Sequence, residues 1–253
     1  MDDIPHSARR PDDGAVPDGR IFPVTDVRLV LRDDQHPWHR ANVEAIEAHW
    51  HKVSVENPFY FNGTVIMHRG LSLQGGAIEG ISHGVPFSML LHFLATGLKE
   101  ADVWHLFASS ILVASDGALV LIRMSERTAN PGRICAPAGS LDLSDIVDGR
   151  CNIDGNMTRE VAEETGLDLG AARAEAALFG FRQERQITVY RRYHFAETSA
   201  VLAARIKAHI AKEADPEAAD AVIVSSPAGI TEAAPPYMRA FIAFHFAEEP
   251  HRP

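Results

Sequence analysis

Residues 159–167 read R-E-V-A-E-E-T-G-L. Glu160, Glu163 and Glu164 follow the spacing i, i+3 and i+4, so a helix of 3.6 residues per turn projects all three carboxylates from one face. Like charges four residues apart oppose helix formation by a few tenths of a kcal/mol. We therefore expect this face to be either well solvated or neutralised by a cation.

Composition limits what the rest of the chain can do. With 253 residues, 46% of them hydrophobic and 23% charged, the chain is globular and can bury a large core. A formal net charge of -10 argues against binding to nucleic-acid backbones or anionic membranes, both of which need a basic surface. Two cysteines are too few for a disulfide scaffold, and neither a signal peptide nor a membrane span is evident. We expect a cytoplasmic protein.

The first hundred residues predict a tail and a small folded unit. Residues 1–22 are rich in Asp, Pro and Gly and have little to bury, which predicts a mobile tail. Residues 23–104 predict a small α+β unit that flanks the larger remainder of the chain. Its expected elements are strands over 25–32, 64–71 and 76–82 and helices over 36–55 and 86–98.

The remaining residues, 105–253, predict a second and larger unit. Ser115-Asp116-Gly117 is typical of a hairpin turn between two apolar strands. Asn156 or Asp154 could cap the acidic helix, and Gly166 suits its left-handed end. The other expected elements are strands over 111–114, 118–123, 176–182, 187–196 and 222–224 and helices over 200–212 and 237–248.

Two stretches of this unit together resemble a known signature. P-A-G-S-L-D (137–142) followed by residues 159–167 is similar to the Nudix hydrolase pattern: Gly, five residues, Glu, seven residues, then Arg-Glu-apolar-x-Glu-Glu-x-Gly-apolar. The second half matches at every defined position. In the first half Gly139 opens the pattern, Asp145 stands where Glu is expected, and thirteen residues separate Asp145 from Arg159. The resemblance covers about 105–228 and implies an α/β/α sandwich on a mixed sheet.

The resemblance also implies a role for each signature residue. Glu160, Glu163 and Glu164 would bind Mg²⁺ or Mn²⁺, the carbonyl of Gly139 would add a ligand, and Arg159 would orient the carboxylates. Hard divalent cations suit the chemistry, because negative charge builds up on the oxygens when a phosphoanhydride is cleaved. We favour Glu160 as the general base, although some family members use a distal carboxylate. The alternative is an ordinary solvated helix face.

Six further residues are candidates for the site. Glu217 precedes a late strand and could supply an additional acidic ligand, with Glu184 as a second choice, although either could be an ordinary exposed glutamate. Arg123 and Arg127 could bind substrate phosphates, or could simply face solvent. Tyr60 and Phe61 could stack on a base or sugar, or could belong to the core.

The flanking unit bears on the substrate. The run I-E-A-H-W-H-K-V-S-V-E-N-P-F-Y-F-N-G-T (46–64) is similar to the amino-terminal region of Nudix proteins that act on UDP-glucose and UDP-galactose. A nucleotide sugar is therefore the leading substrate class. ADP-ribose, NADH, coenzyme A and dinucleotides stay open, as does a catalytically silent regulator. A homodimer is open too, because the apolar run 236–246 could be either a contact surface or a core helix.

Overall fold

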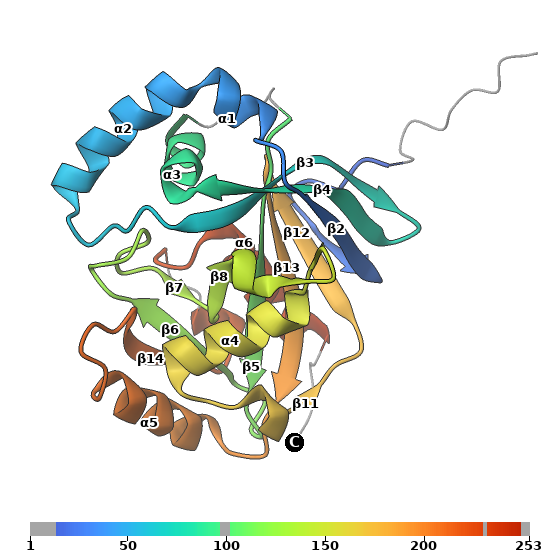
Figure 1. Ribbon diagram of the computed structural model, residues 1–253. Helices are drawn as coiled ribbons and strands as arrows, with labels where there is room; N and C mark the ends of the chain where they lie inside the picture. The colour runs from blue at the N-terminus through green and yellow to red at the C-terminus, as the bar shows by residue number, and fades with distance from the viewer. Residues whose placement is uncertain (1–13, 97–101, 230–231, 249–253) are drawn as a thin grey trace, which may run out of the picture.

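Two β-sheets organise the protein, in a computed structural model that describes residues 14–96, 102–229 and 232–248 (Figure 1). The larger sheet runs, in spatial order, β1 (Ile21–Val24), β12 (Leu178–Gln183), β13 (Gln186–His194), β5 (His105–Val113), β6 (Leu119–Met124) and β14 (Ala218–Val224), with β7 (Ile134–Cys135), β8 (Ala138–Ser140) and β11 (Arg173–Ala174) paired alongside. The smaller sheet runs β3 (Thr64–Gln74), β4 (Ala77–Pro86), β2 (Asp26–Arg32), β10 (Arg150–Cys151) and β9 (Ile146–Val147). Each sheet contains one parallel pair, β13 with β5 and β2 with β4, so both sheets are mixed.

Helices cover both faces of the larger sheet. They are α1 (Pro37–Ala41), α2 (Val43–Glu56), α3 (Phe87–Thr96), α4 (Ile153–Thr165), α5 (Ser199–Ile210) and α6 (Pro236–Glu248), with short 3-10 turns at Leu143–Asp145, Leu169–Ala171 and Pro227–Gly229. Helices α4 and α5 lie on one face and α6 on the other, while α2 and α3 cover the smaller sheet (Figure 1). The predicted α/β/α sandwich on a mixed sheet is confirmed. Across the described ranges, no helix has both the length and the apolar character to cross a membrane.

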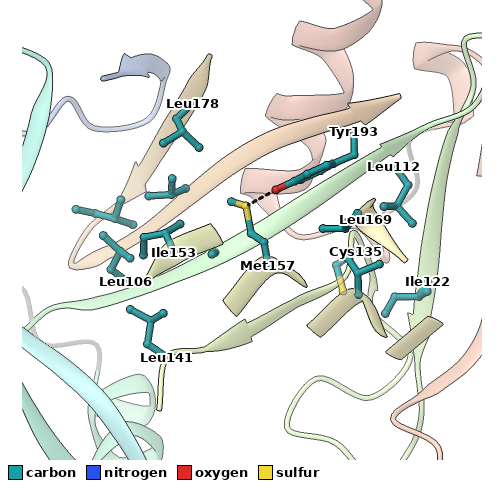
Figure 2. Packing of buried hydrophobic residues seen from close by; sticks show 14 of the residues in the cluster. Leu106, Leu112, Ile122, Cys135, Leu141, Ile153, Met157, Leu169, Leu178 and Tyr193 are labelled. Atoms are coloured by element: carbon teal, nitrogen blue, oxygen red, sulfur yellow. Dashed lines mark hydrogen bonds between the residues drawn. The ribbon is translucent and has the colours of Figure 1, made fainter. Parts of the chain in front are cut away.

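Strand alternation divides the core between the two faces. In β5, Leu112 packs in the cluster that contains α4, whereas Ile111 packs in the cluster that contains α6. Figure 2 shows Met157 of α4 pointing into the first cluster, where the Tyr193 hydroxyl donates to its sulfur at 3.5 Å. The apolar side of the acidic helix is therefore packed against the sheet.

The two sheets share strands from both halves of the chain. Strand β1 pairs with β12 in the larger sheet, and β2 begins in the smaller sheet only two residues after β1 ends. In the other direction, the hairpin β9–β10 from the second half joins the smaller sheet, where Arg150 is paired with Val30. The division into units at residue 105 stays a prediction about independent folding.

Two local expectations need correction, and the open choice for the C-terminal helix is decided. The predicted tail over 1–22 is wrong for its described part, because Val16 is 3% exposed and Phe22 is buried in the same core. The helix expected over 36–55 is two helices, since Asn42 leaves the helical conformation between α1 and α2. The C-terminal helix is a core element, with Phe241 fully buried. The helix end expected at Gly97 lies outside the described residues.

Candidate active site

A pocket of about 640 Å³ opens beside the acidic helix. Its walls come from both halves of the chain. The lining includes residues 59–61, 127–130, 138–140 and 215–217, together with Arg159, Glu160, Glu163 and Glu164 of α4.

Helix α4 begins earlier than either predicted cap, Asp154 or Asn156, would place it. Asn152 is its N-cap, and the Asn152 side-chain oxygen accepts a hydrogen bond from the Gly155 amide at 3.0 Å. Asn156, predicted as a possible cap, instead lies inside the helix and is fully buried. The helix ends as predicted at Gly166, whose φ of 65° is left-handed.

Two of the three helix carboxylates are buried against strand β8, at residues 138–139. Glu164 is 5% exposed and accepts a hydrogen bond from the Ala138 amide at 2.9 Å. Glu160 is 8% exposed and lies directly over Gly139, where an added Cβ would come within 1.9 Å of Glu160 Oε1. The glycine is thus required by the close approach of the carboxylate. Glu163 points outward and is exposed.

The pKa values of the two buried carboxylates are raised above their ordinary values. Burial raises the pKa of Glu160 to about 7, against the lowering effect of Arg159, and repulsion from Glu163 and Glu217 adds to the rise. Burial also raises the pKa of Glu164 well above its ordinary value, with repulsion from Glu160 next in importance. Both groups favour a neutralising proton or cation at this place.

Arg159 is the positive centre of this cluster. Its Nη2 lies 2.9 Å from Glu160 Oε1 and 3.0 Å from Asp145 Oδ2, and its Nη1 donates to Glu163 at 2.9 Å. Burial works against its charge, but the hydrogen bond to Asp145 and the surrounding carboxylates outweigh this effect and raise the pKa of Arg159. Asp145, the shorter residue in the signature, is buried and holds the guanidinium in place.

An aromatic and basic rim closes the opposite side of the pocket. Phe61 is 84% exposed, and the guanidinium of Arg127 lies 4.6 Å from the centre of the Phe59 ring. Arg127 also forms an ion pair with Asp215. The flanking segment and the loops of the larger sheet are therefore in contact across the pocket mouth.

The structure brings together most, but not all, of the predicted site residues. Tyr60, Phe61, Arg127, Gly139, Arg159, Glu160, Glu163, Glu164 and Glu217 all line the pocket. Arg123 is not among the lining residues; its Nη1 lies 3.4 Å from the Gly132 carbonyl oxygen on the side of β6. Glu184, the second choice, occupies a turn between β12 and β13 with a φ of 57°.

Sequence reasoning missed two polar residues at the site. Asp215 pairs with Arg127, and no local pattern marks it. Asn156 could have been found by its spacing, because it stands four residues before Glu160 and so on the same helix face. Considering Asn156 only as one of two possible helix caps concealed this relation.

The pocket contains the type of donor atom, oxygen, that hard divalent cations bind. The pocket offers carboxylate oxygens from Glu160, Glu163, Glu164 and Glu217 and the Gly139 carbonyl, which are the ligands that Mg²⁺ and Mn²⁺ prefer. Glu160 and Glu164 are buried beside the guanidinium of Arg159, and the repulsion between the two carboxylates also calls for a cation. Among the described residues, no three His, Cys, Asp or Glu side chains converge closely enough to form a ready-made metal site. Glu163 is exposed, and its carboxylate is paired with Arg159 at 2.9 Å.

Comparison with known proteins gives only distant structural similarities. No protein-family model matches the sequence, and no curated protein matches it. Similar solved structures include the MutT protein from Methanosarcina mazei Go1, with 20% identity, a TM-score of 0.40, and coverage of 58% of this chain and 96% of that chain. A Nudix hydrolase from M. smegmatis, RenU, has 15% identity, a TM-score of 0.39, and coverage of 59% and 88%. A bifunctional NMN adenylyltransferase/ADP ribose pyrophosphatase from Francisella tularensis, complexed with AMP and Mn ion, has 16% identity, a TM-score of 0.41, and coverage of 64% and 46%. These similarities are too distant to assign an activity to this chain.

Proposed function

We propose that the protein is a divalent-cation-dependent hydrolase that cleaves the diphosphate of a nucleotide-linked substrate. One observation carries the proposal. The signature R-E-V-A-E-E-T-G-L forms a helix whose three carboxylates line one pocket together with Gly139. This arrangement matches the site that the Nudix resemblance implies, even though six additional residues interrupt the signature between Asp145 and Arg159.

Each residue has a role that follows from its surroundings. Glu160, Glu163, Glu164 and Glu217 and the Gly139 carbonyl would hold Mg²⁺ or Mn²⁺. Bound cations supply positive charge to the oxygens of the cleaved diphosphate. Glu160 is our choice for accepting the proton of the attacking water, because its carboxylate lines the pocket beside Gly139 and Arg159 holds it in place at 2.9 Å.

Arg159 and the rim would position the reacting groups. Arg159 fixes Glu160 through a short ion pair, and its planar fork suits carboxylates better than a lysine would. Arg127 stands where a substrate phosphate could replace Asp215 as its partner. Tyr60 and Phe61 offer aromatic surface to a base or sugar.

Nucleotide sugars such as UDP-glucose are the leading substrate class, with nucleoside monophosphate and sugar 1-phosphate as products. This choice rests on the resemblance of residues 46–64, whose aromatic end lines the pocket. ADP-ribose, NADH, coenzyme A and dinucleotides are the alternatives within the same chemistry. A cytoplasmic location and a homodimer also stay predictions.

Hydrolysis of a substrate panel tests the proposal. Purified protein is incubated with Mg²⁺ or Mn²⁺ and with UDP-sugars, ADP-ribose, NADH, coenzyme A or diadenosine polyphosphates, and the phosphate products are identified. We expect cation-dependent cleavage of the diphosphate, fastest for a UDP-sugar. Tight binding of one compound without turnover of any would instead favour the silent regulator.

A further inference from the structure

A buried amide lies between two of the carboxylates at the site. Asn156 Nδ2 is 2.9 Å from Asp145 Oδ2 and 3.5 Å from Glu160 Oε1. Arg159 Nη2 reaches the same two oxygens, at 3.0 Å and 2.9 Å. Two donors therefore bridge one pair of acceptors, although the contact from Asn156 to Glu160 is at the long limit for a hydrogen bond.

The orientation of this amide follows from its neighbours. If the Asn156 oxygen and nitrogen were exchanged, an amide oxygen would face two carboxylates that have no proton to offer it when ionised. The nitrogen must therefore face Asp145 and Glu160. This leaves Asn156 Oδ1 buried without a hydrogen-bond partner in the described part of the chain.

Stability alone does not explain an asparagine at this position. The side chain is 0% exposed, and an unsatisfied buried oxygen is costly, so an apolar residue of similar size would suit a purely structural role better. Asn156 is also absent from the pocket lining, so it does not contact a ligand bound there. Its side-chain contacts are with the carboxylates of Asp145 and Glu160.

Asp145 connects the amide to the hairpin that interrupts the signature. Asp145 is one methylene shorter than the glutamate expected there, and its carbonyl accepts a hydrogen bond from the Asn152 amide at 2.7 Å, across the base of the hairpin 146–151. The hairpin is in turn paired with β2. The Asn156 amide thus lies between the short Asp145 side chain and Glu160 and contacts both.

We propose that Asn156 is a positioning residue: together with Arg159 it occupies Oε1 of Glu160, leaving Oε2 as the oxygen that binds the cation. A neutral amide can donate a hydrogen bond to Glu160 without adding charge to the cluster of carboxylates. Outer partners of this kind orient metal-binding side chains, and their loss commonly weakens metal binding. The role in turnover rests on the proposed function, whereas the role in cation binding can be measured without it.

Mn²⁺ titration of the full chain, followed by electron paramagnetic resonance, tests the proposal. Asn156→Leu keeps a similar volume and removes the donor, and we expect Mn²⁺ to bind it about tenfold more weakly than the wild type. If a substrate is turned over, kcat should fall while KM stays within about twofold, because Asn156 lies outside the pocket lining. Should Asn156→Leu fail to fold, Asn156→Ala, which adds no bulk, takes its place in the same measurements.

Asn152→Ala is the matched control, since it alters an asparagine one turn earlier in the same helix. It removes the cap on Gly155 and should lower Tm while leaving Mn²⁺ affinity unchanged. A variant at Asn156 that lowers Tm but binds Mn²⁺ as tightly as the wild type would overturn the proposal and make the residue structural. Failure of the wild type to hydrolyse any diphosphate is a separate result, which would refute the proposed function alone.

Discussion

The carboxyl group of Glu164 is buried, and folded proteins rarely bury a carboxyl group without a charged partner. It is 5% exposed, it accepts a hydrogen bond from the Ala138 amide, and Glu160 repels it. Burial and repulsion together favour its protonated form in the absence of a cation. A residue this unfavourable for stability is expected where function requires negative charge.

Glu164→Gln should separate stability from activity. The amide keeps the shape of the protonated side chain and cannot ionise, so the cation-free protein should unfold at the same or a higher temperature than the wild type. Cation-dependent turnover should fall by about 100-fold or more. Thermal unfolding in EDTA and a steady-state assay give the two values. Unchanged cation-dependent turnover would contradict the assignment of Glu164 to the site.

Glu163→Gln is the control for this prediction. It changes a carboxylate of the same helix that is exposed and pairs with Arg159 at 2.9 Å. Exposed pairs of this spacing contribute only about 0.3–0.5 kcal/mol, so Tm should hardly change.

At the scale of elements, the sequence predicted α4 through its periodicity and its glycine end, but not the way in which the helix begins. The six extra residues fold as the hairpin β9–β10, with Asp148 and Gly149 at φ values of 49° and 74°. Another Asp-Gly pair, at 116–117, predicted a hairpin turn correctly because long apolar strands flank it. Here the strands are two residues each, and the partner strand β2 lies more than a hundred residues away, so local pattern could not reveal the pairing.

The hairpin turn gives a prediction about stability. Gly149→Ala places a side chain at a left-handed φ and should lower the free energy of unfolding by about 1 kcal/mol. Asp148→Asn is the adjacent control, because asparagine also tolerates a left-handed φ, and it should leave stability unchanged. Chemical denaturation followed by circular dichroism measures both. Equal stability of the two variants would mean that the turn conformation differs from the one described.

At the scale of the whole molecule, buried histidines lie where the two sheets meet. The backbone of His68 in β3 exchanges two hydrogen bonds with Trp104 just before β5, at 2.9 and 2.8 Å. Burial lowers the pKa of His68 to about 3 and that of His105 to about 4, and His36 beside them is lowered to about 4. Protonation of these rings is therefore unfavourable in the folded protein.

Histidines and glutamates make opposite contributions to the pH dependence of stability. An unfolded histidine takes up a proton near its ordinary pKa of 6.5, whereas folded His105 does so only near 4, so stability falls as the pH drops through this window. Buried Glu160 and Glu164 have raised pKa values, so the folded state holds more protons and stability falls as the pH rises. In the cation-free protein the two effects partly cancel.

Two variants should resolve this cancellation. His105→Gln removes a contribution of at most about 1.4 kcal/mol per pH unit between pH 4.5 and 6.5, so its unfolding free energy should depend less on pH than that of the wild type. Glu164→Gln removes the opposing contribution and should lose stability more steeply on acidification. Urea unfolding in EDTA at several pH values measures the slopes, with the exposed His51→Gln as control. If the slope of unfolding free energy against pH changed in the same direction in both variants, the prediction would be contradicted. A histidine with a lowered pKa and a glutamate with a raised pKa must change this slope in opposite directions.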